Sequence, residues 1–111
     1  MVLLADALVP AGKKVYVTNI LLSVGGGTAW TDATATKATV ECTDGTDVVA
    51  YAKAGLTANV VLNDLGGANL TPGATTLSGA GLTAAKGLQI VADANFGAGS
   101  NISVVVSGVI K

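Results

Sequence analysis

Apolar and polar side chains alternate with a period of two along several short stretches of this chain. In residues 36–42, with the sequence TKATVEC, the apolar positions are separated by Lys37, Thr39 and Glu41. A strand with one buried face shows this period, because successive side chains point to opposite sides of a sheet. Residues 43–47 contain an Asp-Gly pair that tolerates a tight turn, and residues 48–53 return to strand-forming side chains. The pattern predicts a β-hairpin.

The same reasoning predicts four further strands, at residues 15–24, 59–65, 88–92 and 101–110. Residues 93–101, rich in Gly, Ala and Asn, are predicted to form a loop. No long segment repeats apolar side chains at the helical spacing, and residues 82–86 allow one turn at most. We therefore predict an all-β chain, an antiparallel β-sandwich or jelly-roll-like single domain over residues 9–111. Residues 1–8 would precede it as an N-terminal arm.

The predicted strand at residues 15–24 is apolar on both of its alternating faces. A strand at the surface of a sandwich needs only one apolar face. Strict alternation places Ile20, Leu22 and Val24 on one face and Val15, Val17 and Leu21 on the other. We expect the core to bury the first set and a neighbouring subunit to cover the second.

The composition supports a self-associating protein. Apolar residues make up 50% of the 111 residues and charged residues only 12%, about half the usual share. A domain of this size has much surface to cover, so part of an apolar surface is expected to be buried in an assembly. No segment provides the roughly 20 consecutive apolar residues of a membrane-spanning helix, and the N-terminus lacks the basic start of a signal peptide. We predict no membrane partner.

The charged residues argue against nucleic-acid binding. All six basic residues are lysines, and the net charge is −1. Recognition of phosphates and bases relies on the bidentate guanidinium group and on basic patches. We predict no nucleic-acid partner.

The residue types also argue against catalysis. The chain has no histidine, which is the usual general base and the commonest metal ligand. Cys42, the single cysteine, is predicted to be a small buried hydrophobe. Asp44 and Asp47 are predicted to belong to the hairpin turn, with adventitious calcium binding as the alternative. We expect no enzyme activity, no catalytic or metal-binding residues and no cofactor.

Trp30 is the only tryptophan, and it lies in a polar segment after three glycines. Gly25, Gly26 and Gly27 are not followed by the residues of a phosphate-binding loop, and they predict a flexible connection. Trp30 is equally compatible with core packing and with anchoring an interface, a role that tryptophan often fills.

The order of several segments resembles a recurrent family, the small β-sandwich virion proteins of tailed bacteriophages of the capsid decoration or cement type. The resemblance is carried by the phrase at residues 9–14, the strand at 15–22, the late strand at 88–92 and the final strand at 102–110. The middle of the chain is similar only in composition. Residues 85–87, Ala-Lys-Gly, replace a Gly-Asp turn that such proteins often carry before the late strand.

The resemblance implies a structural virion protein, made in the host cytoplasm, that binds the outer surface of the capsid as a homotrimer and bridges capsomers. Its partners would be other copies of itself and the major capsid protein. The subunit contact would be lined by Val15, Val17, Leu21 and Trp30. The arm would face the capsid through Met1, Val2, Leu3, Leu4 and Leu8.

Two alternatives to a capsid decoration protein stay open. A neck, tail or baseplate ring component could be built on the same sandwich. A carbohydrate-binding module is disfavoured, because aromatic residues make up only 4% of the chain and sugar platforms use several.

Overall fold

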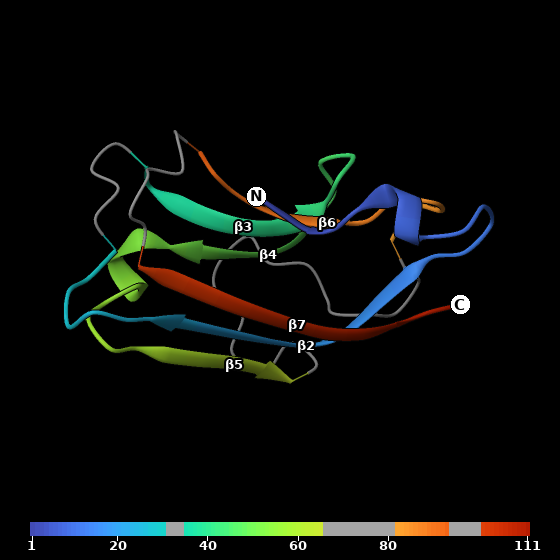
Figure 1. Cartoon of the computed structure of the whole chain (residues 1–111). Coiled ribbons are helices and arrows are strands. Elements are labelled where there is room, and N and C mark those ends of the chain that lie inside the picture. Colours follow the sequence, from blue (N-terminus) through green and yellow to red (C-terminus); the bar gives the residue numbers. More distant parts are fainter. Residues whose placement is uncertain (31–34, 66–81, 94–100) are drawn as a thin grey trace.

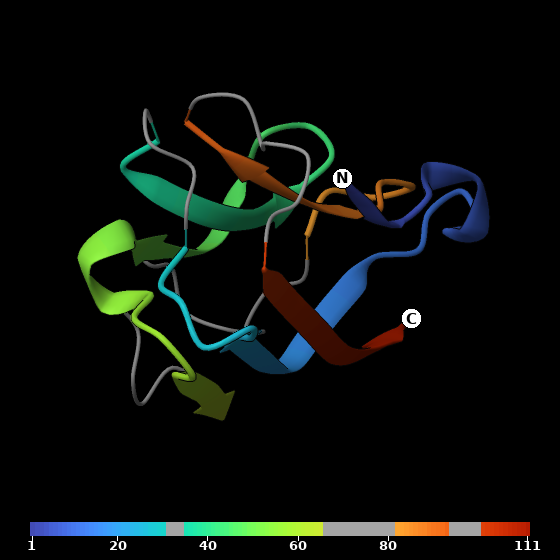
Figure 2. The same ribbon diagram turned by 60° about the vertical axis from the view of Figure 1, so that its left-hand side comes forward.

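The structure is a computed structural model that describes residues 1–30, 35–65, 82–93 and 101–111. These residues form two antiparallel sheets packed face to face, so the predicted β-sandwich is confirmed (Figures 1 and 2). The strands are β1 (Val2–Leu4), β2 (Val15–Val24), β3 (Lys37–Cys42), β4 (Asp47–Ala52), β5 (Val61–Leu65), β6 (Leu88–Ala92) and β7 (Ile102–Ile110). Two short 3-10 helices are η1 (Asp6–Leu8) and η2 (Lys53–Gly55). Most of the loop predicted at residues 93–101 lies outside the described residues.

Sheet A has four strands in the order β1-β6-β3-β4, and sheet B has three in the order β5-β2-β7. Strands β3 and β4 form the predicted hairpin. Its turn contains Gly45, whose φ of +93° favours glycine. The other neighbours are distant in sequence, since β2 pairs with both β5 and β7. Among the described residues no helix is long and apolar enough to cross a membrane.

A β-bulge in β2 changes which of its side chains face the core. Val17 pairs with Gly108 and Asn19 pairs with Ser107, so Thr18 is an extra residue without an opposite partner. The extra residue reverses the alternation. Side chains at 15 and 17 point inward before the bulge, and those at 20, 22 and 24 point inward after it.

The bulge corrects our prediction for this strand. Val15 and Val17 are only 3% and 2% exposed, because they belong to the core of their own chain. Strict alternation assigned them to the wrong face. Apolar residues therefore occur at odd positions of β2 before the bulge and at even positions after it, and both sets face the same core.

Gly108 allows the two strands to approach closely at the bulge. A Cβ atom built on Gly108 would lie 2.4 Å from the carbonyl oxygen of Tyr16 and 3.2 Å from Cα of Val17. Both contacts are with backbone atoms, which cannot rotate away. Gly108 is also the residue that interrupts the apolar even positions of the last strand.

The core lies between the two sheets. Its largest fully buried side chains include Tyr51, Ile20, Leu22, Leu56 and Ile90. Trp30 joins this core at 3% exposure, and its backbone N–H donates to the carbonyl oxygen of Leu56 at 3.1 Å. The ammonium group of Lys53 lies 5.8 Å from the centre of its ring. Of the two roles open for Trp30, core packing is confirmed and interface anchoring is wrong.

Candidate interaction surfaces

The arm at residues 1–8 is part of sheet A. Strand β1 pairs with β6, the N-terminal amine donates to the carbonyl oxygen of Ile90 at 2.9 Å, and the Ile90 N–H donates to the Met1 carbonyl at 2.9 Å. Leu3 and Leu4 pack against the core. Met1, Val2 and Leu8 are exposed. Of the five arm residues expected to face a capsid, these three therefore point toward solvent.

Asp6 holds the arm to the body of the domain. Its carboxylate accepts hydrogen bonds from the hydroxyl of Thr43 and, at 2.7 Å, from the N–H of Gly87. The ammonium group of Lys86 lies 3.5 Å away. These donors lower the pKa of Asp6 below its usual value, with the Thr43 hydroxyl contributing most.

Gly87 lets the arm pack directly on the start of β6. A Cβ atom at Gly87 would lie 1.8 Å from the carbonyl oxygen of Leu4. Residues 85–87 are thus the segment on which the arm packs. Lys86 pairs with Asp6 there, and Gly87 makes room for the backbone.

The outward face of sheet B carries exposed apolar side chains. Leu21 of β2 and Val105 of β7 are directly opposite each other, with exposures of 37% and 59%. The same face continues through Val61 of β5 and Val109 of β7, both exposed. We call the set Leu21, Val61, Val105 and Val109 the outer face. Between its members lie uncharged polar side chains such as Ser23, Ser103 and Ser107.

Of the four residues predicted to line a subunit contact, only Leu21 lies on the outer face. Val15, Val17 and Trp30 are buried within the chain and are unavailable to a second subunit. The prediction missed the three valines. The signal for two of them was present in the last strand, where Val105 and Val109 occupy odd positions while apolar side chains at even positions face the core.

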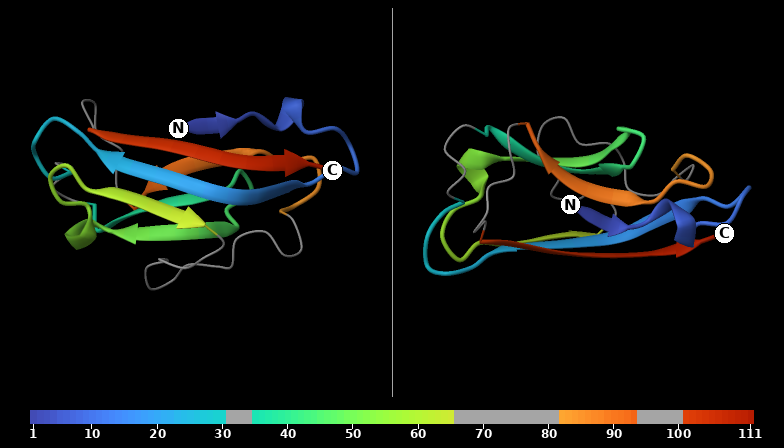
Figure 3. Two further views of the ribbon diagram at one scale, coloured as in Figure 1. Left: turned by 90° about the horizontal axis from the view of Figure 1, so that it is seen from below. Right: turned by 45° about the horizontal axis from the view of Figure 1, so that its top comes forward.

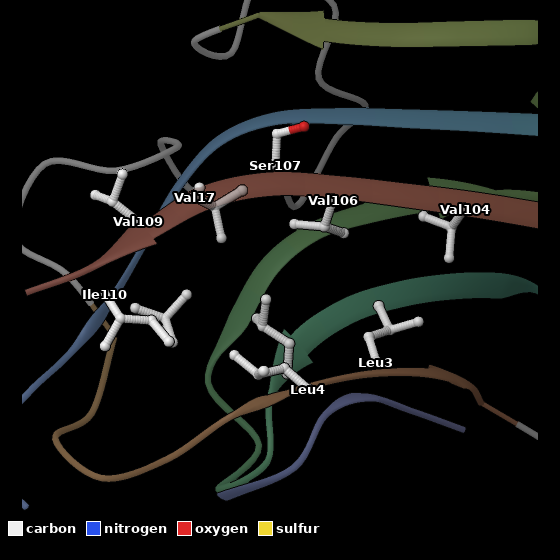
Figure 4. A pocket seen from close by; sticks show the side chains of 11 residues that line it. Leu3, Leu4, Val17, Val104, Val106, Ser107, Val109 and Ile110 are labelled. Carbon is white, nitrogen blue, oxygen red and sulfur yellow. The ribbon is translucent and has the colours of Figure 1, made fainter. Parts of the chain in front are cut away.

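An apolar cleft of about 340 Å³ opens between the edge strands β1 and β7. Figure 4 shows Leu3 and Leu4 on one side of it and Val104, Val106 and Ile110 on the other. Val15, Val17 and Leu88 form its inner wall, and none of the described residues that line it carries a charge. The sequence could not indicate this cleft, because the two strands that border it lie almost a full chain length apart.

The remaining aspartates stabilise turns and strand ends. Asp44 accepts from the N–H of Thr46 at 3.0 Å and from the Thr83 hydroxyl, and these bonds lower its pKa well below the usual range. Asp93 accepts from the hydroxyl and N–H of Thr36, which lower its pKa to about 2. Asp44 lies in the turn between β3 and β4, as predicted, whereas Asp47 is the first residue of β4.

The described residues contain no group of three or more His, Cys, Asp or Glu side chains placed to hold a metal ion. Cys42 is completely buried, as predicted. Comparison of the chain with protein-family models, curated proteins and solved structures finds no match.

Proposed function

We propose that this chain is a structural protein of a tailed-phage virion, a decoration or cement protein that reinforces the outer surface of the capsid as a homotrimer. The outer face is the observation that supports the proposal. On β2 and β7 this face carries Leu21, Val105 and Val109 beside uncharged polar residues, and next to Val109 the ammonium group of Lys111 lies 4.9 Å from the ring centre of Tyr16. A sheet surface with exposed branched side chains and little charge is suited to contact with other proteins. The resemblance of the segment order to phage decoration proteins supplies the class of assembly.

The mechanism is burial of apolar surface between subunits and between subunit and capsid. A standard interface buries about 800 Å² per partner. At about 25 cal/mol per Å² of apolar area, the part that remains after association costs is several kcal/mol. Symmetric repetition over a capsid multiplies this term, so each copy needs only a modest contact.

The exposed part of the arm is the proposed capsid contact. Met1, Val2 and Leu8 present apolar side chains to solvent while Asp6 holds the arm against the domain. A pre-ordered arm loses less conformational entropy on binding than a free tail. The major capsid protein is the proposed partner at this site.

The first test is the native mass of the purified protein by light scattering after size exclusion. The proposal predicts three times 10.8 kDa. Leu21→Asp places a charge on the outer face and is expected to lower the native mass toward the monomer. Ala54→Asp adds the same charge at an exposed position of η2 and serves as the matched control.

A mass unchanged by Leu21→Asp would remove the outer face from the subunit contact. A ring of six or twelve copies would favour a neck, tail or baseplate component, and a stable monomer would contradict the homotrimer. An antibody to the purified protein then tests the location. It should label the capsid surface of particles from the source of the gene, and labelling confined to the tail would refute capsid decoration.

A further inference from the structure

Strand β7 is the last strand at one edge of sheet B as the described residues form it. It runs for nine residues and contains no proline and no charged side chain, and in the described part of the chain β2 is the strand that pairs with it. Natural edge strands are usually shortened, bulged, covered or charged, because exposed backbone groups recruit further strands. The bulge at this pair lies in β2 and leaves β7 continuous. A strand at such an edge can pair with a further strand through its backbone groups.

The backbone groups that face the free edge can be assigned. Lys14 and Lys111 exchange both of their backbone hydrogen bonds at 3.1 Å, and Gly25 donates to Asn101 at 2.8 Å. Hydrogen-bonded and non-bonded pairs alternate along an antiparallel ladder. The N–H groups of Val105 and Ser107 therefore point toward β2, and those of Val104, Val106 and Gly108 point away from it.

The place beside β7 is a missing strand position. Sheet A has four strands and sheet B has three, and β1 extends past β7 when sheet B is viewed face-on (Figure 3, left). Leu3 and Leu4 of β1 line the cleft. A fourth strand in sheet B would pair with β7 and lie opposite β1. Its inward side chains would enter the cleft.

We infer that the cleft accepts an extended segment of another protein as a fourth strand of sheet B. The segment carries apolar side chains at alternate positions and no charge at those positions. The second requirement follows from the cleft lining, because none of its described residues carries a charge that could compensate a buried charge. The volume of about 340 Å³ exceeds twice that of a cavity that binds benzene, about 150 Å³, so it holds several branched side chains.

The interface area favours a flexible segment over a second folded copy. Nine residues span about 30 Å, and two packed sheets are about 10 Å apart, so edge-to-edge pairing buries only about 300 Å² per partner. A stable interface needs about 800 Å². If two copies paired antiparallel through their β7 strands, the β1 strand of each copy, which extends past β7, would also collide with that of the other copy. A single extended segment avoids this obstruction and fills the cleft.

The proposed function enters at one point only, because we take the partner to be a component of the same assembly. Strand addition combines main-chain hydrogen bonds for affinity with side-chain pockets for selectivity. It would connect the domain to a partner through a site that shares Val109 with the outer face but not Leu21, Val61 or Val105.

The probe is the peptide KTVTVTVTVTK, which presents valine on one face and threonine on the other. Amide hydrogen exchange, resolved by NMR, is measured with and without saturating peptide. Exchange at Val104, Val106 and Gly108 is expected to slow at least tenfold, while Val105 and Ser107 serve as internal controls. The same peptide methylated on its valine nitrogens is expected to bind at least tenfold more weakly, because those nitrogens would face β7.

Two neighbouring substitutions separate this site from the outer face. Val104→Lys places an ammonium group in the cleft and is expected to abolish peptide binding without changing the native mass. Val105→Lys places it on the outer face and is expected to lower the native mass while peptide binding persists. Peptide binding by a chain that proves monomeric would retain the inference and reject the homotrimer.

Three results would overturn the inference. One is equal binding of the methylated and unmethylated peptides. Another is concentration-dependent protection of the Val104 and Val106 amides without peptide, which would assign the edge to a second copy. The third is binding of lauric acid with no response to the peptide, which would assign the cleft to a small apolar ligand.

Discussion

Replacing Gly108 by alanine tests the bulge that decides which side of β2 faces the core. The added Cβ would lie 2.4 Å from the carbonyl oxygen of Tyr16, and real Cβ atoms essentially never approach other atoms within 3.0 Å. Strand β7 must therefore move by at least about 0.6 Å, and the core side chains on both strands move with it. Overpacking of this kind costs about 1–3 kcal/mol.

A smaller effect opposes this cost. Alanine reduces the freedom of the unfolded chain and gains about 0.4–1 kcal/mol where its conformation is compatible. Gly108 does not have a positive φ, so this gain applies. The net expectation for Gly108→Ala is a destabilisation of about 1–2 kcal/mol. For a domain of this size the midpoint of thermal unfolding then falls by roughly 5–10 °C.

Urea and thermal unfolding followed by circular dichroism measure the effect. Gly55→Ala is the matched control, because nothing lies within 4 Å of its added Cβ and its φ is ordinary. The control is expected to be neutral or slightly stabilised. If Gly108→Ala were as stable as Gly55→Ala, the close approach at the bulge would be refuted, and with it the assignment of Val17 to the core.

Three further outcomes follow from the same geometry. Val17→Thr buries a hydroxyl and should cost about 1–3 kcal/mol in urea unfolding, whereas Leu21→Thr on the outer face of the monomer should cost less; equal costs would support strict alternation. Gly87→Ala should displace the arm and accelerate exchange of the Ile90 amide, which bonds to Met1; an unchanged rate would contradict the docked arm. Aspartates with lowered pKa values, such as Asp93 at about 2, bind fewer protons folded than unfolded, so the unfolding midpoint should be level at neutral pH and fall between about pH 4 and 2; a midpoint insensitive to that range would contradict these hydrogen bonds.

The strands themselves were predictable because their signals are local. Alternation in residues 36–42 and the Asp-Gly turn before residues 48–53 reflect the pleat and the φ tolerance of single residues. The burial of Cys42 followed from its place in that alternation. Neither inference needed knowledge of the neighbouring strands.

The interaction surfaces were predicted less well because they depend on strand partners. Leu21 was correctly separated from the core, but Val15 and Val17 were placed with it, since a one-residue bulge reverses the phase of a strand. Nothing in the local sequence marks Thr18 as the extra residue of a bulge, because threonine is an ordinary strand residue. The bulge exists because Gly108, ninety positions later, allows the backbone of β7 to approach Tyr16.

By itself, the sequence determined that this protein is an all-β domain with little charge, a buried cysteine and six strands at nearly their final bounds, while β1 was predicted only as part of an arm. Only the tertiary structure decided the sheet order, the phase of β2, the docking of the arm on Gly87 and the cleft between β1 and β7. Local backbone preference and side-chain period act between residues that are near in sequence. Register and edge exposure are properties of strands brought together from opposite ends of the chain, and they form only when the two sheets pack.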